Sequence, residues 1–282
     1  MDRENALPEL TACEIEEIKT KARSKLGECK KTYDVIGVQL FHILSMYARV
    51  IYYPLGKKAP WGFTHMRGSS GGAASEKPFV AINTSIPIDC QIFAAAHELY
   101  HIWYDSSDDA VTEAVLAEAG ENRNELKANR FAAEFLVDAD MLSQEMRFYD
   151  IDPARITIKD ILVMAALFTV PYRTMVKRLH ESGVIDKKAR GCFLAETDEN
   201  IAKYRKIYSI PTPEADERIA IDNMVELAAN AYEAGLITYE KLEYLLRVND
   251  LKPEDIGASS PAIYDPPSEE ELDIIMEGRE LE

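Results

Sequence analysis

The alternation of apolar and polar positions predicts helices at the start of the chain and a short β region after them. Residues 12–31 and 35–48 carry apolar side chains three or four positions apart, which is the spacing of an amphipathic helix. Three runs rich in β-branched and aromatic residues follow at 49–53, 61–66 and 79–83, separated by turns rich in proline and glycine. We therefore expect a small three-stranded antiparallel sheet.

The same analysis predicts that the rest of the chain is helical. Two strong helical patterns span residues 91–104 and 124–137. Two shorter helices fall within 158–185, and amphipathic patterns at 215–234 and 239–248 predict two more. The fold class that follows is α+β, mostly helical, with the small sheet near the N-terminal end and a helical region at the C-terminal end.

The predicted elements divide the chain into four segments. We expect an N-terminal helical segment at 1–34, a core at 35–190 that includes the helix pair at 158–185, a helical C-terminal region at 191–260, and an acidic, poorly ordered tail at 261–282. Within the core, the glycine-rich stretch 68–75 is either a hairpin tip or a flap beside a cleft.

Composition excludes several classes of protein. Hydrophobic residues make up 47% of the 282 positions, so we expect a globular chain with a sizeable core. The net charge of -17 disfavours nucleic acid as a partner and favours basic proteins. The 4 cysteines form no C-x-x-C pair, which excludes a thiolate zinc site. Because no apolar run is long enough to span a membrane and the charged N-terminus lacks an apolar signal region, we expect a cytoplasmic protein with no membrane partner.

The chemistry-bearing motif of the chain is His97-Glu98-Leu99-Tyr100-His101, inside the predicted helix 91–104. Residues four apart share one face of a helix, so His97 and His101 can present two imidazole nitrogens to one metal ion. Glu98 lies beside that face and can reach a metal-bound water. This is the H-E-x-x-H arrangement, in which zinc is the usual ion and the glutamate is the usual general base. The alternative, two surface or core histidines, does not explain the adjacent glutamate.

A catalytic zinc needs a third protein ligand, and the helix 124–137 offers a candidate. Glu125 and Asn129 stand four residues apart and so share a face, although asparagine is a poor helix former. One interpretation is that Glu125 binds the metal and Asn129 orients a ligating histidine from behind. A surface glutamate beside a surface asparagine explains the spacing equally well.

These two motifs together resemble the ImmA/IrrE metallo-endopeptidases, which are zincin-like cytoplasmic zinc proteases. The first motif is Ala96-His97-Glu98-Leu99-Tyr100-His101, and the second is Glu125-x-x-Ala128-Asn129-Arg130-Phe131-Ala132. The resemblance covers roughly residues 35–185. It implies that Zn²⁺ is the cofactor, that His97, His101 and Glu125 are its ligands, and that Glu98 is the catalytic base.

The chain departs from the family pattern at two places. Tyr100 stands where the family often has glycine, and Val137-Asp138 replaces a frequent Met-Pro. Neither position is a ligand, so these departures bear on the substrate rather than on the metal site.

Two further groups are candidates for contacts with a substrate. Tyr104 lies one turn beyond His101 and could stabilise a transition state, although a packed aromatic ring is the more economical interpretation. An exposed strand could pair with an extended peptide by strand addition. The candidate residues for that strand are Phe79, Val80, Ala81, Ile82 and Asn83.

The function expected from this resemblance is zinc-dependent endopeptidase activity on a repressor-like regulatory protein, which could itself bind DNA. The alternative is a DNA-binding or protein-binding regulator that keeps the metal site without turnover. It rests on the helix-turn-helix-like pair at 158–185, where Arg173, Lys177 and Arg178 are expected to be exposed.

Overall fold

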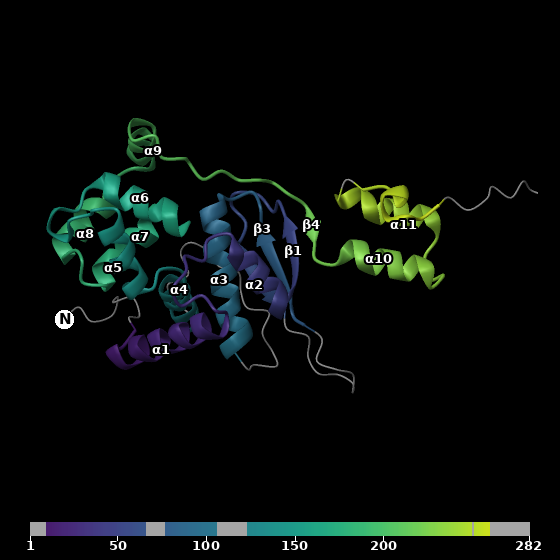
Figure 1. The fold of residues 1–282 in the computed structure, drawn as a ribbon, viewed down its shortest axis with the longest axis horizontal. Helices are drawn as coiled ribbons and strands as arrows, with labels where there is room; N and C mark the ends of the chain where they lie inside the picture. The colour runs from purple at the N-terminus through teal and green to yellow at the C-terminus, as the bar shows by residue number, and fades with distance from the viewer. Residues whose placement is uncertain (1–9, 66–76, 106–122, 250, 260–282) are drawn as a thin grey trace, which may run out of the picture. The chain divides into compact units, whose positions relative to one another are not determined.

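The computed structural model describes residues 10–65, 77–105, 123–249 and 251–259 (Figure 1). The chain divides into two compact units, residues 1–222 and 223–282. The stretch 68–75 and the tail 261–282 lie outside the described residues. The four segments expected from the sequence stay a prediction.

Two helices precede the sheet, as the apolar spacing predicts. α1 (Ala12–Glu28) begins with a capping box in which Thr11 and Glu14 satisfy each other's backbone N–H groups. It buries Ile18, Ala22 and Leu26, which are spaced four apart and line one face. α2 (Gln39–Tyr47) follows and also packs into the main core.

The sheet has four strands, so the expected three-stranded antiparallel sheet is wrong. Its strands lie in the order β2 (Gly62–His65), β3 (Phe79–Asn83), β1 (Arg49–Tyr53), β4 (Ala220–Ile221). β1 is parallel to β3, whereas β2 pairs antiparallel with β3 and β4 pairs antiparallel with β1. After β1 the chain crosses to the far edge to form β2 and returns between them as β3. The sheet is mixed because β3 lies beside β1 and runs in the same direction. This pairing joins segments far apart in the sequence, so local patterns do not specify it.

This strand order corrects the prediction that Phe79–Asn83 adds a substrate strand. β3 carries hydrogen-bonded neighbours on both sides, β1 and β2, so it offers no free edge. The edge strand of this half of the sheet is β2.

The fourth strand also corrects the predicted helix at 215–234. Its first part forms β4 and the extended segment before it, where the N–H of Glu217 donates to the carbonyl of Thr84 and the N–H of Asp222 donates to that of Val50. Helix α10 (Met224–Glu233) therefore begins only after the chain leaves the sheet. Pairing with the sheet overrides the amphipathic pattern here.

α3 (Ile88–Tyr104) lies with α2 on one face of the sheet and packs against α4 (Arg123–Leu136) (Figure 1). Residues Ala94–Ala96 are fully buried, and their small side chains allow neighbouring backbones to pack close to α3. On the far side, Trp103 meets Phe131 and Phe135 edge-on, with ring centroids 5.9 and 5.7 Å away. Every residue of α3 from Gln91 to His101 is buried, so this part of the helix lies in the interior of the unit.

A group of shorter helices completes the first unit, and four short helical segments lie in the described part of the second. The first group comprises α5 (Ala139–Phe148), η1 (Pro153–Arg155), α6 (Ile158–Phe168), α7 (Tyr172–Glu181), α8 (Lys187–Leu194) and α9 (Asp198–Ile207). In the second unit α10 packs with α11 (Tyr239–Leu246), η2 (Arg247–Asn249) and η3 (Pro253–Ile256) around Ala228, Leu242 and Leu246.

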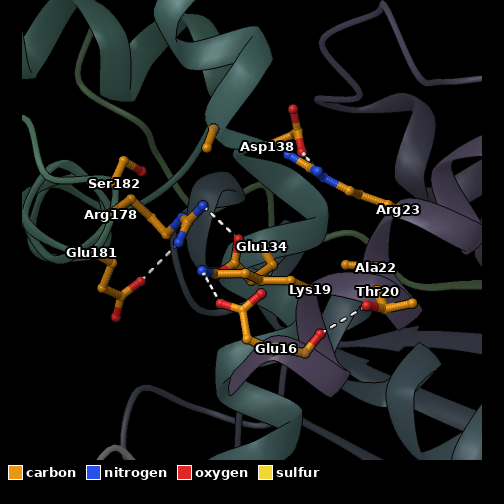
Figure 2. A pocket seen from close by; sticks show the side chains of 11 residues that line it. Glu16, Lys19, Thr20, Ala22, Arg23, Glu134, Asp138, Arg178, Glu181 and Ser182 are labelled. Atoms are coloured by element: carbon orange, nitrogen blue, oxygen red, sulfur yellow. Dashed lines mark hydrogen bonds and ion pairs between the residues drawn. The ribbon is translucent and has the colours of Figure 1, made fainter. Parts of the chain in front are cut away.

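α6 and α7 form the predicted helix pair, but Arg178 is not on its surface. Arg178 is 1% exposed, because its guanidinium donates to Glu134 Oε2 at 2.7 Å and to the carbonyl of Val137 at 2.8 Å. It also bonds Glu181 at 2.9 Å, beside a cavity of about 320 Å³ between α1, α4 and α7 (Figure 2). The expectation that Arg178 is exposed is therefore wrong. Its charge ties α7 to α4 instead.

We expect the Arg178→Ala variant to lower the free energy of unfolding by about 3 kcal/mol, because it leaves the buried Glu134 carboxylate without one of its two arginines. Urea denaturation of the two proteins measures this difference. The matched control is Lys177→Ala, at an exposed neighbour on the same helix, which should change stability by less than about 0.5 kcal/mol. Equal stability of both variants would contradict the structural role of Arg178.

Candidate metal centre

His97 and His101 occupy successive turns of α3 and are buried at its contact with α4. Their Nε2 atoms lie 2.9 Å apart. The four-residue spacing read from the sequence thus brings both imidazole nitrogens to one point, on the side of α3 that faces away from solvent.

Glu125 reaches the same point from the first turn of α4. Its Oε2 lies 3.0 Å from His97 Nε2, and its Oε1 lies 3.5 Å from His101 Nε2. One ligand atom from each of the three residues falls within 4.8 Å of the others. Of the two interpretations left open by the spacing of Glu125 and Asn129, this geometry supports the metal-ligand one.

The protonation pattern of the imidazoles fits a cation. His97 Nδ1 lies 3.0 Å from Asn129 Oδ1, and His101 Nδ1 lies 2.6 Å from Asp105 Oδ2. Both oxygens are acceptors, which favours the tautomer that carries its proton on Nδ1. In that neutral tautomer each Nε2 presents a lone pair.

Among the described residues, the Glu125 carboxylate also has an unsatisfied oxygen. Glu125 Oε2 is buried and has no hydrogen-bond partner among the described residues. Two nitrogen lone pairs and a carboxylate in a buried space repel one another unless a positive charge lies between them. A divalent metal ion supplies that charge, and two histidines with one glutamate form a donor set used by catalytic zinc.

Sequence reasoning missed the residues that orient His101. Asp105, which follows α3 directly, accepts from His101 Nδ1 and also from Asn124 Nδ2 at 2.6 Å. Asp105 stands four residues after His101, so the helical spacing that indicated Asn129 could have indicated Asp105 as well. Although burial lowers the pKa of His101, the hydrogen bond to Asp105 and the nearby carboxylates raise it overall.

Glu98 lies beside the histidine pair and is held by strand β2. The Thr64 hydroxyl donates to Glu98 Oε2 at 2.7 Å. A Cβ on Gly62 would come within 3.3 Å of Glu98 Oε1, so the glycine keeps space next to that oxygen. Burial raises the pKa of Glu98, against the nearby imidazoles and the Thr64 hydroxyl, which lower it. No local pattern could have indicated Thr64 or Gly62, because they reach Glu98 across the fold.

Tyr104 does not point to this centre. Its hydroxyl donates to the carbonyl of Lys21 in α1 at 3.4 Å, and its ring packs against Tyr100 and Phe131. Burial raises its pKa to about 12. This placement supports the packed-aromatic interpretation over a transition-state role.

Comparison with known proteins identifies the domain that contains these residues. A family model described as IrrE N-terminal-like domain, peptidase M78, matches residues 46–180. Over these residues the chain belongs to the ImmA/IrrE family. The resemblance read from the two motifs is confirmed. The IrrE-like domain contains the three residues that can hold a metal, and its family indicates a metallopeptidase. No curated protein and no solved structure matches the chain.

We expect the protein, stripped of metal, to bind one equivalent of Zn²⁺ and to gain thermal stability, because a ligand that binds only the folded state stabilises it. In the Glu125→Ala variant the affinity should fall by more than about 100-fold, since loss of an outer-shell partner alone costs about 10- to 100-fold. Competition with a chromogenic chelator measures the Zn²⁺ dissociation constants of the wild type and of Glu125→Ala.

The control for this experiment is Glu17→Gln, which removes an exposed carboxylate whose ion pair is to Lys21 within α1. It should bind Zn²⁺ as the wild type does. A Glu125→Ala variant with wild-type affinity would show that the carboxylate is not a ligand.

Proposed function

We propose that this protein is a zinc-dependent endopeptidase in which His97, His101 and Glu125 hold the metal and Glu98 is the general base. The observation that carries the proposal is the buried convergence of two imidazole Nε2 atoms and a carboxylate oxygen without a hydrogen-bond partner among the described residues, next to a second, oriented carboxylate. Family membership independently indicates a metallopeptidase.

In the proposed hydrolysis, different residues of the chain have different roles. When bound, zinc supplies a Lewis acid and lowers the pKa of water to about 7. Thr64 holds Glu98 Oε2, which leaves Oε1, beside the space kept by Gly62, to accept a proton from the attacking water. The same carboxyl then returns the proton to the leaving amine. Burial raises the pKa of Glu98, which makes its carboxylate a stronger base.

The substrate backbone would bind along β2. This strand lies at the edge of the described sheet. Its Thr64 hydrogen-bonds the Glu98 carboxylate, and a Cβ added at its Gly62 would come within 3.3 Å of Glu98 Oε1. An extended peptide added beside β2 would pass next to the base through main-chain hydrogen bonds. β2 therefore takes the role that the sequence had suggested for Phe79–Asn83.

The substrate that we propose is a repressor-like regulatory protein. The resemblance to the family suggests this class, and the net charge of -17 favours a basic, DNA-binding protein as partner. We also propose that the reaction takes place in the cytoplasm. Within the part of the chain that the structure describes, no helix is long and apolar enough to cross a membrane.

The alternative, a DNA-binding regulator built on α6 and α7, receives less support from the geometry. Arg178 is buried in ion pairs, and the Arg173 guanidinium donates to the carbonyl of Leu194 at 3.0 Å. Of the three cations expected on the surface of α7, Arg178 is buried, whereas Arg173 and Lys177 are exposed as predicted. A gel-shift assay with duplex DNA tests this alternative directly.

We expect Glu98→Gln to bind Zn²⁺ as tightly as the wild type and to lose cleavage by at least about 100-fold, because the amide cannot accept the proton. The zinc-loaded proteins are incubated with a DNA-binding repressor, and mass spectrometry detects new peptide termini. Cleavage at the wild-type rate by Glu98→Gln would disprove the base assignment. Tight binding of the repressor by both proteins, with no cleavage by either, would favour the protein-binding regulator.

We expect Thr64→Val to lower kcat about 10- to 100-fold with little change in KM, because it removes a hydrogen bond to a charged group, worth about 1.5 to 3 kcal/mol. Thr64→Ser keeps the hydroxyl and should retain most of the activity. Steady-state kinetics on a peptide spanning the cleavage site measures both constants. Equal losses in the serine and valine variants would show that packing of the methyl group matters more than the hydrogen bond.

A further inference from the structure

The first turn of α4 holds three consecutive residues that reach three different parts of the fold. Arg123 binds Glu14 of α1, Asn124 donates to Asp105 after α3, and Glu125 meets the two imidazoles. The first four N–H groups of a helix have no partner within the helix, so the first turn is the least constrained part of α4. A metal ligand placed there depends on contacts from outside.

The contact from α1 is a two-pronged ion pair. Arg123 Nε lies 2.8 Å from Glu14 Oε1, and Arg123 Nη2 lies 2.6 Å from Glu14 Oε2. Lys127, one turn further along α4, adds a third contact at 3.4 Å to Oε1. Such fork-to-fork pairing sets the orientation as well as the distance of the two side chains.

Glu14 is itself held in place. Its Oε2 accepts from the backbone N–H of Thr11 at 2.9 Å in the capping box that starts α1. The hydrogen bonds from Arg123 and Thr11 hold the pKa of Glu14 well below its usual range, so the carboxylate stays ionised at neutral pH. Arg123 thus binds a side chain that has little freedom of its own.

α1 is anchored along its whole length. Ile18, Ala22 and Leu26 are buried, and the ammonium of Lys25 lies 4.9 Å from the ring centroid of Trp103 in α3. Near the cavity between α1, α4 and α7, Arg23 reaches Asp138 at 3.5 Å (Figure 2). A movement of α1 relative to α4 would break contacts at both ends, so α1 can act as a rigid support.

We propose that Glu14 is a positioning residue for the metal centre, acting through Arg123 to hold the first turn of α4 and thereby the Glu125 carboxylate. α1 lies outside residues 46–180, so this support comes from beyond the IrrE-like domain. The inference rests on the proposed metal centre. It assigns a role in that centre to a helix that contains none of its ligands.

The experiment begins with metal-free protein, so that it does not depend on zinc. Hydrogen exchange followed by mass spectrometry compares wild type, Glu14→Gln and Glu17→Gln over the peptide that covers 123–131. Glu17 matches Glu14 as an α1 carboxylate, but its ion pair is to Lys21. We expect faster exchange in that peptide only for Glu14→Gln, because only this variant loosens the first turn. Equal exchange in all three proteins would overturn the proposal.

The second readout is the dissociation constant for Zn²⁺, measured by chelator competition. We expect Glu14→Gln to weaken binding about 10-fold, at the lower end for outer-shell changes, and Glu17→Gln to leave it unchanged. Arg123→Met should weaken binding similarly, and the double variant should bind Zn²⁺ no more weakly than Glu14→Gln alone, because that variant already removes the ion pair with Arg123.

Two results distinguish a failure of the positioning role from a failure of the proposed function. Faster exchange in Glu14→Gln with unchanged Zn²⁺ affinity would overturn the positioning role while leaving the proposed function intact. A wild-type protein that binds no Zn²⁺ would overturn the proposed function and this role with it, and the exchange data would still report whether Glu14 holds α4.

Discussion

The structure depends on one constraint, the placement of electron-pair donors close together in a buried space. The Nε2 atoms of His97 and His101 lie 2.9 Å apart and face the Glu125 carboxylate, one oxygen of which has no hydrogen-bond partner among the described residues. Such an arrangement is costly without a cation. Asn129 and Asp105 favour this arrangement, since an oxygen of each accepts a hydrogen bond from Nδ1 of one histidine and so turns Nε2 toward Glu125.

The elements around this centre come from distant parts of the chain and serve different purposes. α3 supplies both imidazoles and Glu98, and its buried alanines let neighbouring backbones approach closely. α4 supplies Glu125, whose helix turn is tied to α1 through Arg123 and to the end of α3 through Asn124. β2 contributes no ligand, but it orients Glu98 through Thr64 and leaves room beside it at Gly62. In the function that we propose, this arrangement assigns metal binding and proton transfer to different residues.

The charges of α7 illustrate how a sequence pattern can mislead about function. A proline-started helix with three basic residues resembles the recognition helix of a DNA-binding protein. In the folded chain Arg178 is buried and neutralised by Glu134 and Glu181, so its charge joins two helices of the core. The same residue type on a helix can serve packing or recognition, and burial decides between them.

The sequence by itself determined those features that depend on spacing within one helix. His97, Glu98 and His101 meet because residues four apart share a helix face, and Asn129 lies near Glu125 for the same reason. The two motifs were also enough to indicate the family. Tertiary structure alone decided the parallel pairing of β1 with β3, the late strand β4, the hydrogen bond of Thr64 to Glu98, and the ion pair of Glu14 with Arg123.

The physical reason is that a helix brings near neighbours in sequence together through its own geometry, whereas strand pairing and side-chain contacts between elements depend on how the whole chain packs. Asp105 lies between these cases. Its spacing from His101 was visible in the sequence, but only the contact with Asn124 across the fold showed that it serves the metal centre.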